Sequence, residues 1–161
     1  MTRLIATVFG VGLLKPAPGT WGSAAGLIAG VFIHILGGFF LLCAATIAVT
    51  AVGYWAIAVE VGDSHDDPSE FVIDEVAGQW VALWPVSFGA WMMGSDIWAL
   101  YPGVIAAFLA FRAFDILKPG PVGWADRQHG AFGIMADDVI AGWLAAMVVM
   151  LLAVVAHGVM V

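Results

Sequence analysis

The ionisable residues of this chain are concentrated in two patches, 63–75 and 111–138. Long apolar runs flank both patches, and ionisable groups in such surroundings are costly unless they have a function. Carboxylates dominate the two patches, and a few cations accompany them. This combination at a membrane surface indicates a site for a divalent metal ion and a phosphate group.

Asp74 and Glu75 are the leading candidates in the first patch, because they directly precede an apolar run that would desolvate them. Asp67, Glu70 and Asp74 have spacings of three and four, so on a helix they would share one face, with Glu75 about 100° away. The alternative is a solvated acidic loop, which fits Asp63, Asp66 and Asp67 better than it fits Asp74 and Glu75.

Arg112, Asp115 and Lys118 in the second patch have the spacing of one helix face. They form either an internal ladder of ion pairs or a functional set with Asp115 on a metal and the cations on a phosphate. Asp137 and Asp138 precede the last apolar run, where one of them could simply cap a helix. Carboxylate oxygens suit a hard cation such as Mg²⁺, and no His/Cys grouping indicates zinc.

A Gly/Pro-rich turn at 15–23 leads into the first long apolar run and carries Lys15, Thr20 and Ser23. Backbone N–H groups at such a helix start favour an anion. The order of residues is not that of a P-loop, and a plain capped helix start is the alternative.

The elements that hold these residues are predicted to be membrane helices. Of the 161 residues, 63% are hydrophobic, and neither 19–59 nor 139–161 contains Asp, Glu, Lys or Arg. A spanning helix needs about 20 apolar residues. We therefore predict an all-α, polytopic membrane protein in which residues 1–161 form one domain, with about five spans at 20–36, 39–59, 76–93, 97–117 and 136–160. We expect a tight turn at Gly37-Gly38 and a loop at 119–123.

The distribution of cations predicts the orientation. With five spans, all of the basic residues lie on one side of the membrane, together with both charged patches: Arg3, Lys15, Arg112, Lys118 and Arg127. That side is expected to be the cytoplasm. The net charge of −7 argues against a nucleic-acid partner, which would require a basic surface.

Four blocks of the sequence resemble the phosphatidylglycerophosphatase A family: GLLKPAPGTWGS (12–23), VIDEVAGQ (72–79), FRAFDILKP (111–119) and GIMADDVIAG (133–142). They occur in order and cover most of the chain. The resemblance implies an all-helical fold and Mg²⁺-dependent hydrolysis of phosphatidylglycerophosphate, a phospholipid substrate, to phosphatidylglycerol and phosphate at the inner membrane of a bacterium. The chain departs from the family at Gly120, where an aromatic residue is frequent.

The resemblance carries over specific residues. The acidic positions of the family correspond to Asp74, Glu75, Asp115, Asp137 and Asp138, which we expect to bind the metal, and its basic positions correspond to Arg112 and Lys118. We expect catalysis by Asp74, Glu75, Asp138 and Lys118. We expect phosphate binding by Arg112, Lys118, Lys15, Thr20 and Ser23. Direct attack by water and a phospho-aspartate intermediate are both open.

Two other functions are compatible with the charge pattern. An ion or proton transporter with an acidic cytoplasmic mouth would place ionisable groups near the middle of its spans, where this chain has only His34. A lipid phosphotransferase would share the metal site and differ in its acceptor.

Overall fold

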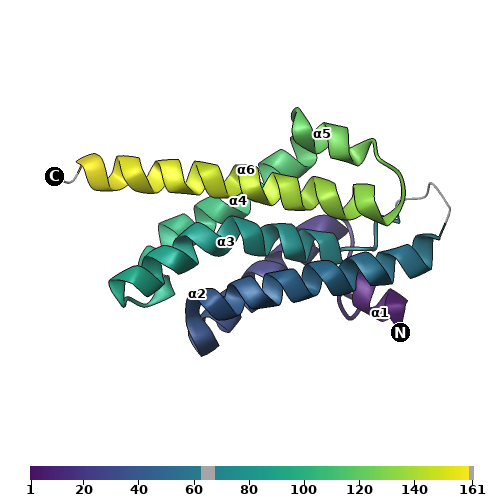
Figure 1. Cartoon of the computed structure of the whole chain (residues 1–161), viewed down its shortest axis with the longest axis horizontal. Coiled ribbons are helices and arrows are strands. Elements are labelled where there is room, and N and C mark those ends of the chain that lie inside the picture. Colours follow the sequence, from purple (N-terminus) through teal and green to yellow (C-terminus); the bar gives the residue numbers. More distant parts are fainter. Residues whose placement is uncertain (63–67, 160–161) are drawn as a thin grey trace.

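The computed structural model describes residues 1–62 and 68–159, and the described chain is all-helical, as predicted. The end of α6 (Gly130–Val159) lies far from the N-terminus, which shares one end of the molecule with α5 (Pro121–Asp126) (Figure 1). The elements in chain order are α1 (Thr2–Ala6), η1 (Val11–Leu13), α2 (Pro18–Val61), α3 (Ile73–Met93), η2 (Ile97–Leu100), α4 (Tyr101–Leu117), α5 (Pro121–Asp126) and α6 (Gly130–Val159).

The helix α2 reverses at Gly37 and Gly38, whose dihedral angles are not helical. Gly38 has φ of +70°, a conformation that glycine adopts without steric cost. The predicted turn is therefore confirmed, and it divides α2 into a first arm (18–36) and a second arm (39–61). Both arms pack on α3: Trp80 donates to the carbonyl of Gly26 in the first arm at 2.6 Å, and Trp84 donates to Thr46 in the second at 3.2 Å.

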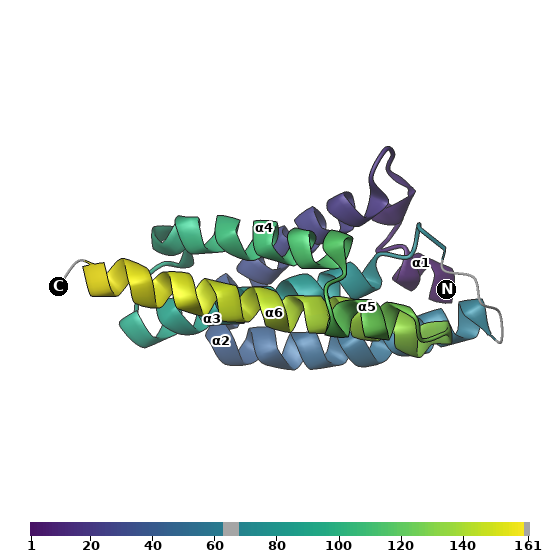
Figure 2. The same cartoon turned by 90° about the horizontal axis from the view of Figure 1, so that it is seen from above.

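Helices α3 and α6 approach each other closely because glycines face each other across the contact. A Cβ atom on Gly78 would overlap the backbone oxygen of Asp138, and one on Gly142 would overlap the backbone of Gly78. Small residues allow such contacts between helices in lipid. The close approach brings the backbone of Asp138 against the first turns of α3. Figure 2 shows α4 and the second arm on opposite sides of α6.

Within the described residues, three helices are long and apolar enough to cross a membrane: Pro18–Val61, Ile97–Leu117 and Gly130–Ala156. Large apolar side chains point outward from them, including Ile28, Ile47 and Val154. Such a surface suits contact with lipid and would be exceptional in a water-soluble monomer. The chain is therefore a membrane protein.

The boundaries of two helices differ from the prediction. Residues 121–126 form α5, which replaces part of the loop predicted at 119–123, because Pro121 at the first helical position is preorganised for a helix. The last helix begins at Gly130 instead of 136, so Asp137 and Asp138 lie about two turns inside α6. Neither aspartate caps this helix, and that alternative is wrong.

The prediction that Glu70 and Asp74 share one helical face is also wrong. Helix α3 begins only at Ile73, so Glu70 lies in the preceding turn and pairs with Arg3 at 3.0 Å. The preceding segment is held to the N-terminus instead, because the amide of Val72 donates to the carbonyl of Ala6 at 2.8 Å. Asp63, Asp66 and Asp67 lie outside the described residues.

Candidate active site

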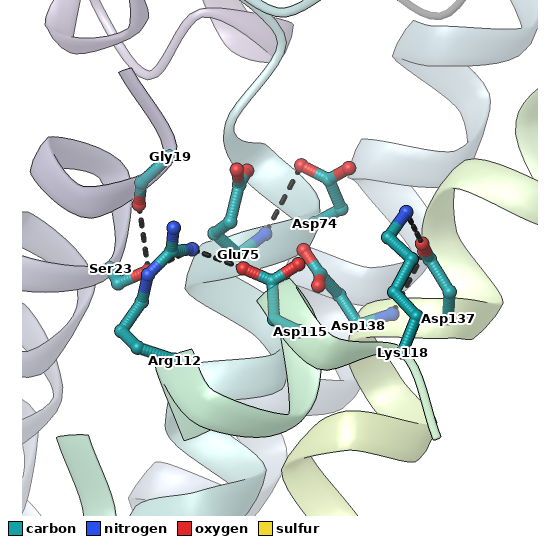
Figure 3. Close-up of polar contacts among 9 residues, drawn as sticks. All are labelled: Gly19, Ser23, Asp74, Glu75, Arg112, Asp115, Lys118, Asp137 and Asp138. Carbon is teal, nitrogen blue, oxygen red and sulfur yellow. Dashed lines mark hydrogen bonds and ion pairs between the residues drawn. The ribbon is translucent and has the colours of Figure 1, made fainter. Parts of the chain in front are cut away.

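A polar cavity of about 350 Å³ lies where the start of α2, the start of α3, the end of α4 and the first turns of α6 meet. The side chains of Figure 3 come from these elements and converge on the same region. Seven of the predicted site residues line the cavity: Asp74, Glu75, Arg112, Asp115, Lys118, Asp137 and Asp138. The two charged patches therefore meet at one cavity.

Asp74, Glu75 and Asp138 form a compact acidic group, the carboxylate triad. Each offers an oxygen within 4.8 Å of the others. Asp74 and Asp138 are buried, with 7% and 4% of their surface exposed. Burial, followed by the adjacent Glu75 charge, raises the pKa of Asp74 well above its usual value. Burial and the Asp138 charge raise the pKa of Glu75 to about 8. Ionisation of all three carboxylates is thus unfavourable unless a cation offsets their repulsion.

The unsatisfied atoms of the triad fit such a cation. Glu75 Oε2 and Asp138 Oδ1 are buried and accept no hydrogen bond from the described residues. Buried polar atoms without partners are rare in native proteins and call for an explanation. Carboxylate oxygens are the ligands that hard divalent cations prefer. The triad can therefore bind a metal ion.

Arg112, a residue of α4, lies beside the carboxylate triad. Its Nη1 donates to Asp115 and, at 3.4 Å, to Ser23 Oγ of the first arm, and Ser23 in turn donates to the carbonyl of Gly19 at 2.7 Å. The Arg112–Asp115 pair matches the first step of the predicted ladder. The guanidinium is thereby held at the cavity by two elements, which suits recognition of a phosphate.

Lys118 does not continue the ladder. This residue directly follows α4 and has φ of +44°, and its ammonium donates to Asp126 and, at 3.0 Å, to Asp137 Oδ2. Burial lowers the pKa of Lys118, but the hydrogen bonds to Asp126 and Asp137 outweigh this and raise it above its usual value. Lys118 therefore stays cationic at the cavity.

The three residues predicted from the 15–23 turn have different positions. Ser23 is buried behind Arg112, Thr20 is half-buried, and Lys15 is exposed. The cavity lining includes Gly19 but none of these three. Sequence reasoning missed Gly19, where a Cβ atom would overlap Glu75 Oε1. Gly19 lies in the first of the four blocks that resemble the family (12–23), and this was the signal in the sequence that could have identified it.

Comparison with known proteins places the chain in a family. The sequence profile described as Phosphatidylglycerophosphatase A matches residues 4–153. The chain is 39% identical to a Haemophilus influenzae protein named Phosphatidylglycerophosphatase A, over 91% of this chain and 85% of that protein. It is 31% identical to the Escherichia coli protein of the same name, over 89% of this chain and 78% of that protein.

A third relative carries another name. The chain is 38% identical to a Bacteroides thetaiotaomicron protein provisionally named a phosphatidylinositol-3-phosphatase, over 86% of this chain and 85% of that protein. No solved structure matches the chain.

The apolar helices and these comparisons together define a membrane phosphoric monoester hydrolase that acts on a lipid. The chain belongs to the phosphatidylglycerophosphatase A family. Membership in a family of lipid phosphatases makes it an enzyme, so the transporter alternative falls away.

Proposed function

We propose that this protein hydrolyses phosphatidylglycerophosphate to phosphatidylglycerol and inorganic phosphate, with Mg²⁺ as cofactor. The observation that carries the proposal is the buried carboxylate triad in the same cavity as Arg112 and Lys118. The anionic triad would bind a cation, and the two cationic side chains would bind the phosphate beside it. Family membership supplies the lipid class of the substrate.

Asp74, Glu75 and Asp138 would hold the metal, while Asp115 and Asp137 stay hydrogen-bonded to Arg112 and Lys118. Held there, Mg²⁺ would supply a Lewis acid that polarises phosphoryl oxygens and lowers the pKa of water. The bond from phosphorus to the glycerol oxygen breaks, and a bond from phosphorus to the oxygen of water forms. A carboxylate, Asp74 or Glu75, accepts the proton from water and returns it to the leaving glycerol oxygen, which becomes the free hydroxyl of phosphatidylglycerol. Arg112 and Lys118 offset the charge on the phosphoryl group.

The cavity is adjacent to the apolar surface, as a lipid substrate requires. Pro18 and Ile116 line it together with the charged residues, and Ile116 and its neighbour Leu117 are both exposed. The phosphate would enter the polar cavity while the acyl chains stay against apolar side chains. Because the cavity takes residues from both α2 and α6, we also propose that 1–161 is one domain.

The assay that tests the substrate uses purified protein and lipid dispersed in detergent micelles. Phosphate release is measured from phosphatidylglycerophosphate and, because of the name of the Bacteroides relative, from phosphatidylinositol-3-phosphate. We expect faster release from phosphatidylglycerophosphate. Faster release from the inositol lipid would reject the proposed headgroup.

Lys118→Ala should raise KM about tenfold or more, because a hydrogen bond to a charged group contributes about 1.5–3 kcal/mol and 1.4 kcal/mol corresponds to about tenfold. The dissociation constant of Mg²⁺ should change by a smaller factor than KM. The matched control is Arg127→Ala, which removes an exposed cation near the same end of the molecule. An unchanged KM for Lys118→Ala would remove Lys118 from the phosphate site.

We propose five membrane crossings with the site at the cytoplasmic face of the inner membrane. The 44 residues of α2 would extend about 66 Å if straight, roughly twice the hydrocarbon thickness of a bilayer. Reversal at Gly37-Gly38 supports one crossing for each arm, and α3, α4 and α6 supply the others. The helix ends that carry the cations gather around the cavity, which favours a cytoplasmic location for it.

Cysteine labelling tests this orientation in a Cys43→Ala background. Ser69→Cys, at an exposed cavity residue, should react with a membrane-impermeant maleimide only after the inner membrane is opened. Ala99→Cys, at an exposed position in η2, should react in intact spheroplasts. Reaction of the residue-69 cysteine from outside would overturn the proposed topology.

A further inference from the structure

Gln79 is a buried residue of α3 to which the mechanism above gives no role. It lies four residues after Glu75, on the same helical face, and none of its surface is exposed. Neither its Oε1 nor its Nε2 has a hydrogen-bond partner among the described residues. A buried amide that pairs with nothing is unfavourable, so this side chain requires an explanation.

The neighbours of Gln79 define the direction of its side chain. Gly78 packs against the ring of Phe111 on α4, and Val76 packs against Gly26 of the first arm. Successive helical residues project about 100° apart, so the side chain of Gln79 projects between the directions of Gly78 and Val76. It therefore faces the boundary, or seam, where α4 meets the first arm. Arg112 crosses this seam to reach Ser23. Because helical side chains tilt toward the N-terminus of their helix, the amide of Gln79 extends toward Glu75.

The unpartnered atoms in this region are complementary. Arg112 Nε is a buried donor without an acceptor, and Glu75 Oε2 is a buried acceptor without a donor. A glutamine amide supplies the two missing groups, an acceptor oxygen and a donor nitrogen. Glu75 and Arg112 are also close to one another, since both pack against Gly19.

We propose that Gln79 is a positioning residue that joins the phosphate site to the metal site, with Oε1 accepting from Arg112 Nε and Nε2 donating to Glu75 Oε2 in the loaded enzyme. A carboxylate oxygen has two lone pairs, so Glu75 Oε2 can accept this hydrogen bond and still face the metal. This inference rests on the metal-dependent function proposed above. The bridge fixes the plane of the guanidinium and the orientation of the Glu75 carboxylate. Groups that orient metal ligands in this way strongly affect metal affinity.

Gln79→Met tests the bridge, because methionine fills a similar volume without hydrogen-bonding strongly. Titration calorimetry with Mg²⁺ should show binding weakened about tenfold or more. The thermal midpoint without metal should be no lower than that of the wild type, since the substitution removes unpaired polar atoms. Gln128→Met is the control, because Gln128 donates to the Trp124 carbonyl away from the triad.

The opposite result, an unchanged Mg²⁺ affinity with a lower metal-free midpoint, would make Gln79 a packing residue and overturn the inference. A wild-type protein that binds no Mg²⁺ would overturn the metal-dependent function together with the inference. The two failures are thus distinguishable in one set of titrations.

A second measurement does not depend on a folded Gln79 variant. The chain has two glutamines, Gln79 and Gln128, so [¹⁵N]glutamine labelling gives two side-chain NH₂ groups for NMR. Mg²⁺ with inorganic phosphate should shift the Gln79 signals and slow their hydrogen exchange, and leave those of Gln128 unchanged. The spectrum of Gln128→Met assigns them. Unchanged Gln79 signals at saturating Mg²⁺ and phosphate would overturn the inference.

Discussion

Asp74→Asn and Asp138→Asn should each lower phosphate release by about a hundredfold or more while the protein still folds. Either change removes one charge from the carboxylate triad and weakens both metal binding and activation of water, which are worth several kcal/mol in metal enzymes. Without metal, the variants should be at least as stable as the wild type, because the substitution relieves repulsion between buried carboxylates. Phosphate release and thermal unfolding of the purified variants measure the two effects.

The control for these variants is Asp96→Asn. Asp96 is an exposed aspartate that caps η2 by accepting from the amide of Trp98 at 2.9 Å, and asparagine caps about as well. The activity of Asp96→Asn should equal that of the wild type. If Asp96→Asn were more damaging than Asp74→Asn, the carboxylate triad would not be the catalytic centre.

Arg112→Lys should reduce kcat/KM by about a hundredfold, the size of effect found when one donor to a developing negative charge is removed. An ammonium cannot reproduce the planar, two-point contact of a guanidinium with a phosphate. It would also leave the contacts to Ser23 and Asp115 incomplete. Steady-state kinetics on phosphatidylglycerophosphate measure the change.

Arg3→Lys is the matched control, because Arg3 forms an exposed ion pair with Glu70. Exposed ion pairs contribute little to the stability of a protein, about 0–1 kcal/mol. Wild-type kinetics for Arg112→Lys would mean that Arg112 only forms an ion pair with Asp115 and does not contact substrate.

The features of the fold that local sequence determines were predictable. Gly37-Gly38 interrupts a long apolar run, and α4 ends at Leu117 before Lys118-Pro119, as expected from the steric restriction before proline. The start of α6 was not predictable in the same way. Asp137-Asp138 resembles a capping signal, but these aspartates are held inside the helix, where Lys118 and the neighbouring carboxylates surround them.

The candidate site also depends on contacts that local sequence does not predict. Asp74 and Glu75 project in directions about 100° apart, so local helix geometry alone does not bring both carboxylates to one metal. They nevertheless join one triad, because Gly78 projects between these two directions and packs against the backbone of Asp138. Gly19 and Gln79 were missed for a similar reason. Gly19 meets Glu75 and Arg112 on two other helices, and the role proposed for Gln79 likewise depends on a group on α4. A local sequence pattern does not encode such contacts between distant segments.

Removal and return of the metal is the measurement that tests the central claim most directly. Purified protein is treated with excess EDTA, and phosphate release from phosphatidylglycerophosphate is followed before and after Mg²⁺ is restored, with Asp74→Asn in parallel. We predict that activity disappears with EDTA and returns with Mg²⁺ in the wild type, and that Asp74→Asn stays inactive throughout. Full activity after exhaustive chelation would contradict a catalytic metal at Asp74, Glu75 and Asp138.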